Sequence, residues 1–275
     1  MRRAILGLLV LAGCDDATPG TLLDGPRVLA IVAEPPVVAP GTSTRLEAIA
    51  AVDGLPVMAD RVSWRACAPW AVVADPVRDC AGDAAVELTT GPAGEALIDG
   101  DELAARFGFE PPPPPTTTHA CAAAAPTLTV VAELELDGAR LIAKKDVPIA
   151  AAPDRRNPAF VQARIDGAAA DAGAMLPAGA TVRLGADIAI DTLDLACAPD
   201  GNSAREQVRI FVYPGGGAVA DDDSFVIAER EGTIVAGSVE LQLPGEPGDV
   251  PLWMVAVDET GGVAARFAPI VVGVD

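Results

Sequence analysis

The chain has 275 residues, and its 39 acidic residues outnumber 19 basic ones to give a net charge of −20. Because nucleic acids and anionic lipid headgroups are bound mainly through Lys and Arg, this charge excludes a nucleic-acid-binding protein and predicts a body that stands away from anionic membranes. The length exceeds the usual ~100–150 residues of one domain, so we expect two domains.

The first fourteen residues have the layout of an export signal. Arg2 and Arg3 precede an apolar run that ends in small residues and a cysteine, Cys14. This order is typical of a secretory signal, and the closing letters Leu-Ala-Gly-Cys resemble the lipobox of bacterial lipoproteins. The resemblance implies cleavage before Cys14 and acylation of its sulfur and its new amino group. An ordinary signal cut at another position is the alternative.

The expected anchor is therefore a lipid rather than a helix. The apolar run is shorter than the roughly 20 residues that a membrane-spanning helix needs, whereas two or more acyl chains hold a protein stably on a membrane. We expect a signal peptide at residues 1–13 and a lipidated tether at residues 14–26, which are polar with Gly and Pro. This places the protein in the cell envelope, on the periplasmic face or the cell surface, with inner and outer membrane both open.

Residues 27–150 are expected to form a first β-sandwich. Its predicted strands begin with Arg27–Ala33, Thr44–Val52 and Arg61–Cys67. The last two alternate apolar and polar residues, which is the period of a half-buried strand. Residues 53–54, an Asp-Gly pair, are expected to turn the chain.

Residues 68–125 are less regular and are interpreted as an insert in this sandwich. A short helix is predicted at Asp101–Phe107. The five prolines of Pro111–Pro115 favour an extended polyproline II segment. We interpret this run as a stiff surface loop, with a docking site for a proline-binding domain as the alternative.

The clearest hairpin of the chain is predicted at Thr127–Ala150. Apolar residues alternate with Thr and Glu up to Asp137-Gly138, a pair suited to the positive φ angles of a two-residue turn. Residues 151–158, which contain two prolines and two arginines, are expected to be a linker.

Residues 159–275 are expected to form a second β-sandwich built in the same way. In the strand predicted at Thr181–Ile190, apolar residues face inward while Arg183 and Asp187 face outward. The other predicted strands are Phe160–Ile165, Gln207–Tyr213, Phe225–Ala228, Thr233–Leu243, Pro251–Val257 and Val263–Val272. Short strands separated by Gly- and Pro-rich turns predict an all-β chain of two tandem antiparallel sandwiches.

Two stretches resemble a known family. Within Arg27–Cys67 the letters V-L-A-I-V-A-E-P-P-V-V-A-P-G-T-S-T-R-L-E-A and V-S-W-R-A-C, and at Asn157 the letters N-P-A-F-V-Q-A-R-I-D-G, resemble Ig-like domains of exported bacterial lipoproteins. The pair is similar to tandem Ig-like lipoproteins common in myxobacteria. The resemblance implies two Ig-like or fibronectin-like sandwiches, with Trp64 as the buried tryptophan of the first. Since Thr44–Val52 has no cysteine, the antibody-type disulfide is not implied.

Four cysteines remain after the lipidated one: Cys67, Cys80, Cys121 and Cys197. An even number in an exported chain predicts two disulfides, and four cysteines allow three connectivities. Proximity in the sequence favours Cys67–Cys80, which leaves Cys121–Cys197 to join the two halves. A zinc site that also uses His119 is the alternative, although no C-x-x-C spacing is present.

We expect no catalytic residues and no cofactor. His119 is the only histidine and lies beside the proline run, whereas a Ser–His–Asp device needs a histidine held in a rigid site. No G-x-S-x-G sequence occurs. Pairs of carboxylates in an apolar cleft are the remaining catalytic alternative, because 39 acidic residues offer many combinations.

Besides the zinc alternative, the acidic loops suggest a calcium site. Asp221, Asp222 and Asp223 lie in a turn between predicted strands of the second sandwich. Calcium takes six to eight oxygen ligands, which loop aspartates often supply. A second aspartate cluster comprises Asp187, Asp191, Asp194 and Asp200.

These observations favour a non-catalytic, lipid-anchored envelope protein whose partner is an unknown envelope protein or glycan. One alternative is a calcium- or ligand-binding module that uses the acidic loops. The other is an enzyme that acts on glycans through paired carboxylates.

Overall fold

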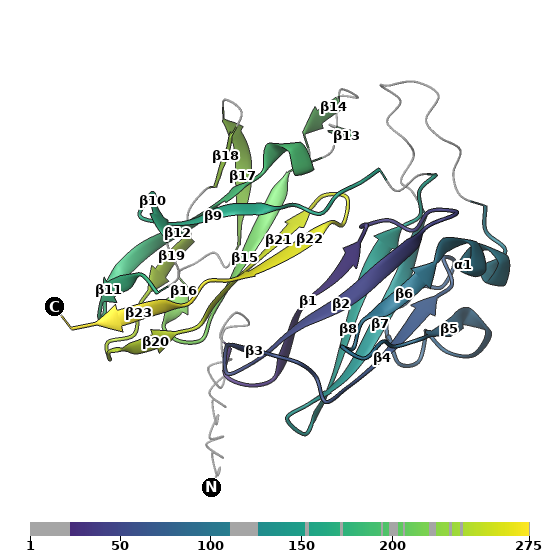
Figure 1. Ribbon diagram of the computed structural model, residues 1–275, viewed down its shortest axis with the longest axis horizontal. Helices are drawn as coiled ribbons and strands as arrows, with labels where there is room; N and C mark the ends of the chain where they lie inside the picture. Colours follow the sequence, from purple (N-terminus) through teal and green to yellow (C-terminus); the bar gives the residue numbers. More distant parts are fainter. Residues whose placement is uncertain are drawn as a thin grey trace, which may run out of the picture.

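The computed structural model describes residues 23–110, 126–151, 154–170, 173–193, 195–197, 203–205, 207–219, 224–230, 233–236 and 239–274. These parts are mostly β-strand, with one α-helix of eight residues, α1 (Gly100–Phe107). Every strand pair among them joins residues within 27–148 or within 160–273, so the strands form two bodies, which lie side by side (Figure 1). The prediction of an all-β chain with two antiparallel sandwiches is confirmed.

The first body is a sandwich of two four-stranded antiparallel sheets. One sheet contains, in order, β1 (Arg27–Glu34), β2 (Ser43–Val52) and β3 (Leu55–Val57), with β6 (Ala96–Asp99) also paired to β2. The other contains β5 (Ala85–Leu88), β4 (Arg61–Cys67), β7 (Thr127–Leu136) and β8 (Ala139–Pro148).

The predicted alternation builds the core of this sandwich. Leu46 from β2, Trp64 from β4 and Leu134 from β7 are all fully buried in one cluster. The indole Nε1 of Trp64 donates to the Gly94 carbonyl at 2.7 Å, which satisfies its polar atom. β7 and β8 meet at Asp137-Gly138, where both residues have positive φ, as the sequence predicts.

The segment interpreted as an irregular insert is more regular than predicted. It supplies a strand to each sheet, since β6 pairs with β2 and β5 pairs with β4. These strands have four residues each, too few for a period of two to be recognised in the sequence. The predicted helix is present as α1, where the Asp99 carboxylate caps the amides of Asp101 and Glu102 and Gly108 ends the helix with φ +66°.

The second body contains a large curled sheet and a small one. Along the large sheet run β10 (Ala168–Ala170), β9 (Phe160–Ile165), β12 (Thr181–Ile188), β18 (Thr233–Ala236), β17 (Ser224–Arg230), β15 (Val208–Pro214), β21 (Leu252–Asp258) and β22 (Val263–Phe267), with β16 (Ala218–Val219) and β19 (Val239–Gln242) attached. The small sheet contains β11 (Met175–Pro177), β23 (Ile270–Gly273) and β20 (Gly248–Val250). A separate hairpin joins β13 (Leu195–Cys197) to β14 (Ser203–Arg205).

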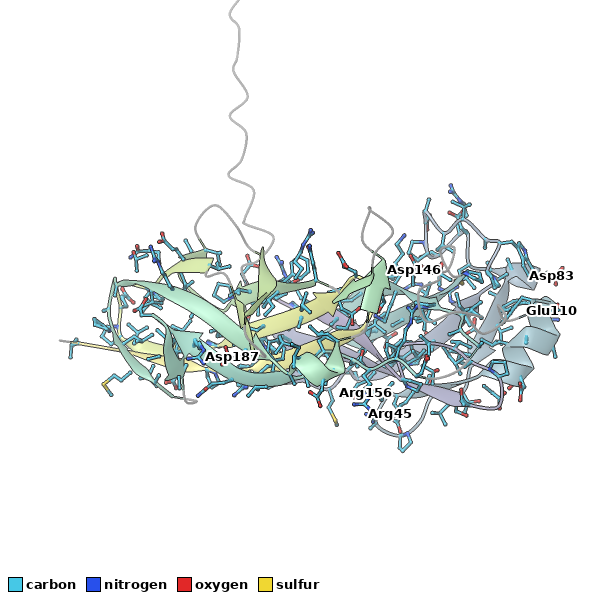
Figure 2. All side chains as sticks on the ribbon, turned by 90° about the horizontal axis from the view of Figure 1, so that it is seen from above. Arg45, Asp83, Glu110, Asp146, Arg156 and Asp187 are labelled. Atoms are coloured by element: carbon cyan, nitrogen blue, oxygen red, sulfur yellow. A yellow bond between two sulfur atoms is a disulfide. The ribbon has the colours of Figure 1, made fainter. Side chains whose placement is uncertain are left out.

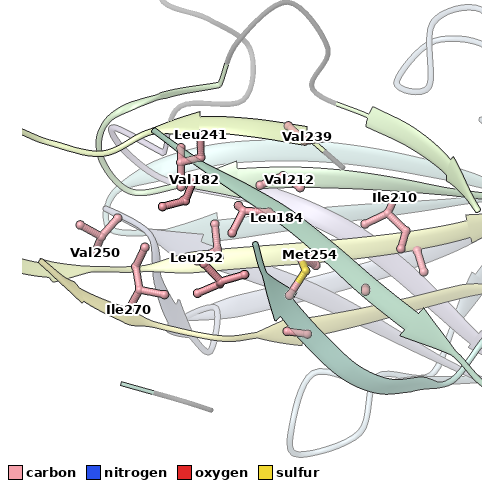
Figure 3. Packing of buried hydrophobic residues seen from close by; sticks show 14 of the residues in the cluster. Val182, Leu184, Ile210, Val212, Val239, Leu241, Val250, Leu252, Met254 and Ile270 are labelled. Carbon is pink, nitrogen blue, oxygen red and sulfur yellow. The ribbon is translucent and has the colours of Figure 1, made fainter. Parts of the chain in front are cut away.

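Apolar side chains from both sheets meet in one core. Figure 3 shows residues of β12, β15, β19 and β21 packed with Val250 and Ile270 of the small sheet. The predicted strand Val263–Val272 is divided, because β22 stays in the large sheet while β23 joins the small one. Pro269, which has no amide hydrogen to donate, lies between the two strands.

Asp187 departs from the prediction that it faces solvent. Its exposure is only 5%, and Arg164 of the neighbouring strand β9 donates to both carboxylate oxygens, with Nε at 2.9 and 3.0 Å. The register between β12 and β9 shifts at this residue. A strand pattern shows that a residue lies on the outer face, but it does not show that an arginine from another strand covers it.

The two sandwiches are joined by an apolar cluster, called here the junction cluster. Leu23, Ala51 and Trp253 are buried in it. The partly buried residues around them are Leu29, Ile49, Tyr213, Ala265 and Phe267. The cluster therefore brings outer-face residues of β1 and β2 against those of β15, β21 and β22, and these faces are not solvated sheet surfaces.

Two details of the first sandwich shape this contact. Leu29 lies where the register of β1 against β2 shifts, so Val28 packs on the core while Leu29 packs on the junction cluster. Gly54, in the turn after β2, accepts the indole N–H of Trp253 at 2.8 Å. A Cβ on Gly54 would lie 2.7 Å from the Cβ of Pro251, so glycine is needed here for its size as well as its φ of +80°.

Two residues expected in the tether and in the linker are fixed at the junction instead. Leu23, assigned to the tether, is 1% exposed and its amide donates to the Pro214 carbonyl at 3.0 Å. Asn157, assigned to the linker, donates from Nδ2 to the Ala33 carbonyl at 2.7 Å and accepts at Oδ1 from the Val263 amide at 2.7 Å. Asn157 thus bonds to both sandwiches.

Lys145 of β8 makes a further bond across the junction. Its Nζ donates to the carbonyl of Gly261, in the loop between β21 and β22. Asp258 shapes that loop, because its Oδ1 accepts from the Gly262 amide at 2.7 Å. Burial lowers the pKa of Lys145 to about 8, against the opposing attraction of Asp258 and Asp146. Figure 2 shows Asp146 where the two sandwiches meet.

Among the described residues, no helix has the length and apolar character required to cross a membrane.

Candidate functional site

A disulfide closes a loop on the outer surface of the first sandwich. Cys67, the last residue of β4, is bonded to Cys80, which confirms the pairing that proximity favoured. Both cysteines are fully buried and form a small cluster with Val73 and Val131. The residues between the cysteines, called here the 67–80 loop, therefore lie against the outer face of the sheet that contains β4 and β7.

Two cations of the sheet hold the inner side of this loop. Arg65 of β4 donates from Nη1 to the Cys80 carbonyl at 3.1 Å, and Lys144 of β8 donates from Nζ to the Val73 carbonyl at 2.8 Å. Val73 itself is 8% exposed. The loop is thus attached at its covalent end and at its middle.

Two carboxylates within the loop accept hydrogen bonds from its backbone amides. Asp79 Oδ2 accepts from the amides of Ala74 and Asp75, at 3.1 and 2.8 Å, and Asp75 Oδ1 accepts from the amides of Val77 and Arg78. The hydrogen bond from Arg78, followed by the backbone bond from Asp75, lowers the pKa of Asp79 to about 2. Asp79 therefore stays ionised as a cap over the whole physiological pH range.

The opposite side of the loop presents large apolar side chains to solvent. Trp70 is 61% exposed, Val72 is 86% exposed and Val77 is 43% exposed. Trp70 follows Pro69 in a tight turn in which the Ala71 amide donates to the Ala68 carbonyl at 2.9 Å. Its ring and that of Phe107 of α1 form a T-shaped pair, with ring centroids 5.7 Å apart and an interplanar angle of 88°.

The surroundings of these side chains are acidic. Residues 68–110 contain nine acidic residues and two arginines, a net of seven negative charges in 43 residues, against 20 in the 275 of the whole chain. Figure 2 shows Asp83 and Glu110 at the end of the first sandwich that lies away from the second. The site is an apolar, covalently closed loop in the most acidic part of this sandwich.

Most of the sequence-predicted site residues lie outside the described residues. These are Cys14, Cys121, His119, Asp221, Asp222 and Asp223. Cys197 ends β13, where it pairs with Ser203, but its side chain is outside the description. Lipidation, the Cys121–Cys197 disulfide, the zinc alternative and calcium binding at the Asp221–Asp223 turn remain predictions.

In the second aspartate cluster, the carboxylate of Asp187 is not available as a calcium ligand. Arg164 forms an ion pair with Asp187 and so neutralises the carboxylate that calcium would need. Across the described residues, no three His, Cys, Asp or Glu side chains gather in a way that would hold a metal ion.

Two carboxylates in the described part of the chain have shifts that do not suit the general acid of the carboxylate-enzyme alternative. The pKa of Asp79 and that of Glu133 are lowered, in each case first by a hydrogen bond from an arginine, Arg78 and Arg140 respectively. A general acid requires the opposite shift, in an apolar cleft.

The 67–80 loop was missed at the sequence level. The available signal was a Pro-Trp pair between two cysteines that are near in sequence. Nothing in that pattern shows that Val73 turns inward while Trp70 and Val72 turn outward, because the loop has no regular period.

No protein-family model matches the chain. A comparison with curated proteins also gives no match.

Similar solved structures have low identity. The titin domains Z1Z2 in complex with telethonin are 15% identical, with 92% of this chain and 98% of that chain covered and a TM-score of 0.24. Dimeric latent PorU from Porphyromonas gingivalis is 9% identical, with 92% and 24% covered and a TM-score of 0.29. The fibronectin(III)-like modules of Clostridium thermocellum CbhA are 13% identical, with 88% and 94% covered and a TM-score of 0.23. The fold assignment therefore rests on the strand pairing described above and not on these alignments.

Proposed function

We propose that this chain is a non-catalytic interaction protein of the cell envelope, held on a membrane by lipid at Cys14. It presents the 67–80 loop to a partner. The observation that supports this function is the exposure of Trp70 and Val72 on a loop whose backbone is fixed by a disulfide and by two carboxylates.

Exposed apolar side chains of this size are informative when they gather on one surface element. Single exposed apolar residues are common, whereas a group of them marks an interaction site. Tryptophan is also among the residues that most often dominate binding energy. Because Trp70 already rests on Phe107, little conformational freedom is lost when a partner covers it.

The junction joins the sandwich that carries this loop to the second sandwich. The junction cluster, the Asn157 bonds and the Lys145 bond connect the two sandwiches at several separate points. Leu23, the first described residue, is buried at the junction. Nine peptide steps separate Cys14 from Leu23, so a lipid on Cys14 would keep the junction within about 30 Å of the membrane.

Anchoring is tested by expression of the full chain and separation of membrane and soluble fractions. We expect the wild type in the membrane fraction, with mass spectrometry showing an acylated N-terminal Cys14. The variant Cys14→Ser is expected in the soluble fraction, with its two sandwiches still folded. An unmodified chain that begins with Met1 would remove the anchoring part of the proposal.

Interaction is tested in native envelopes with the tagged, anchored protein. Chemical cross-linking of the wild type should give discrete complexes that the variant Trp70→Ala loses. Met175→Ala is the matched control, since Met175 is 74% exposed but lies on β11 of the second sandwich. Complexes that are equally abundant in all three proteins would show that this loop is not the contact surface.

A further inference from the structure

We infer that the 67–80 loop is received by an apolar pocket on a partner protein and that lysine and arginine side chains line the rim of that pocket. This inference rests on the proposed interaction function and adds the chemistry of the partner.

The centre of the contact follows from the exposed side chains. Trp70 and Val72 present an indole ring and an aliphatic group, and these two are exposed to 61% and 86%. The amides of Val77 and Arg78 are already bonded to Asp75, so these two backbone donors are not free for a ligand. A dry pocket that encloses the tryptophan matches this surface better than a sugar, whose hydroxyls require polar partners.

The rim of the contact follows from the charge. Elements around Trp70 carry Asp75 in the loop, Asp83 after it, and Asp101 and Glu102 on α1. Of the two arginines of this segment, Arg78 is bonded to Asp79, with Nε at 2.8 Å from Oδ1, and Arg106 lies beside Phe107 on α1, so the segment still carries seven net negative charges. A complementary surface must therefore supply positive charge around the apolar centre.

The same negative charge argues against two other surfaces that could cover the 67–80 loop. An anionic bilayer would repel a loop surrounded by acidic residues, although an exposed tryptophan alone would suit a membrane interface. A second copy of this chain would bring the same negative field to the contact, and like charges across an interface are costly.

The experiment places the photo-reactive residue p-benzoylphenylalanine at Val72 of the full, anchored chain in native envelopes. The matched control carries it at Met175 on the second sandwich. We expect a protein cross-link from position 72 but not from position 175, and the cross-linked peptide should contain Lys or Arg beside apolar residues.

Binding of the identified partner then tests the charge. Affinity should fall by about tenfold or more when salt rises from about 50 to about 500 mM, because the screening length shortens. Trp70→Ala should weaken binding by about 30-fold. Asp83→Lys should weaken it as well, whereas Asp249→Lys, an exposed aspartate of β20, should not. An intact disulfide and an unchanged melting temperature show that each variant is folded.

Each remaining outcome contradicts the inference in a distinct way. Cross-links from position 72 to lipid would assign the loop to a membrane, and cross-links to a second copy would assign it to a dimer. A partner peptide without basic residues, or affinity that salt does not change, would refute the charged rim. Cross-links from position 175 alone would refute the inference but leave an interaction function elsewhere, and no cross-link from either position would contradict both.

Discussion

Lys145 makes the stability of this protein depend on pH in a direction that can be calculated. Its pKa is about 8 in the folded protein, against an ordinary value of 10.5. Below pH 8 the lysine is charged in both states, so the folded state bears the cost of holding a charge at the junction. Between pH 8 and 10.5 the unfolded chain binds a proton that the folded protein does not, so the free energy of unfolding must rise with pH.

The size of the rise follows from the two pKa values. The difference corresponds to about 3.4 kcal/mol, and because the side chain is half-buried, solvent screening reduces the expected rise to about 2–3 kcal/mol. The substitution Lys145→Met keeps much of the apolar stem and removes the charge. At pH 7 the substitution also removes the hydrogen bond to Gly261. Its effect on the free energy of unfolding at this pH is therefore small, because the relief of the buried charge is offset by the loss of that bond.

The assay is urea denaturation of the wild type and Lys145→Met at several values between pH 7 and about 11, with free thiols blocked. Lys144→Met is the matched control, because its Nζ bonds to Val73 within the first sandwich. We expect the wild type and Lys144→Met to gain about 2–3 kcal/mol relative to Lys145→Met as the pH rises. The wild type and Lys145→Met share all other titrating groups, so curves of identical slope for the three proteins would refute the assignment of Lys145 as a costly charge at the junction.

Three further substitutions or conditions test the structure. Gly54→Ala should cost about 1–3 kcal/mol more than Gly138→Ala in thermal unfolding, because both have positive φ but only Gly54 lies against Pro251; equal costs would contradict the junction geometry. Asp187→Asn should lower the melting temperature more than Glu240→Gln does, because Asp187 is buried and bonded through both carboxylate oxygens to Arg164, whereas Glu240 lies in an exposed pair with Arg183; equal effects would contradict the burial of Asp187. Reduction of the Cys67–Cys80 disulfide should lower the free energy of unfolding by about 2–4 kcal/mol and expose the loop to proteases, and an unchanged denaturation midpoint would count against its role as a clamp.

The local sequence pattern was sufficient to predict those strands whose bounds depend on residues nearby in the chain. Arg61–Cys67 and Phe160–Ile165 are strands with the predicted bounds, because alternation and the flanking turns are both visible in the sequence. The Asp137-Gly138 hairpin was predictable for the same reason. The burial of Trp64 is what the resemblance to Ig-like domains implied. The Cys67–Cys80 bond needed only the short separation of the two cysteines.

The candidate site was not predictable in this way. The exposure of Trp70 depends on Val73 turning into the cluster with the disulfide and on Lys144 reaching the loop from β8, 71 residues along the chain. Neither contact has a signature in the residues near Trp70.

The amino-acid sequence alone determined the secondary-structure class, the charge of the surface and the positions of the best turns, since each depends on composition or on residues within a few positions. Only the tertiary structure decided that Ile49 and Ala51 face the second sandwich rather than water, and that Asp187 is covered by Arg164. It also decided that Leu23 and Asn157 are fixed at the junction. The physical reason is that an outer face looks the same in a period-two pattern whether solvent or another part of the chain covers it, and only the packing of distant segments makes that choice.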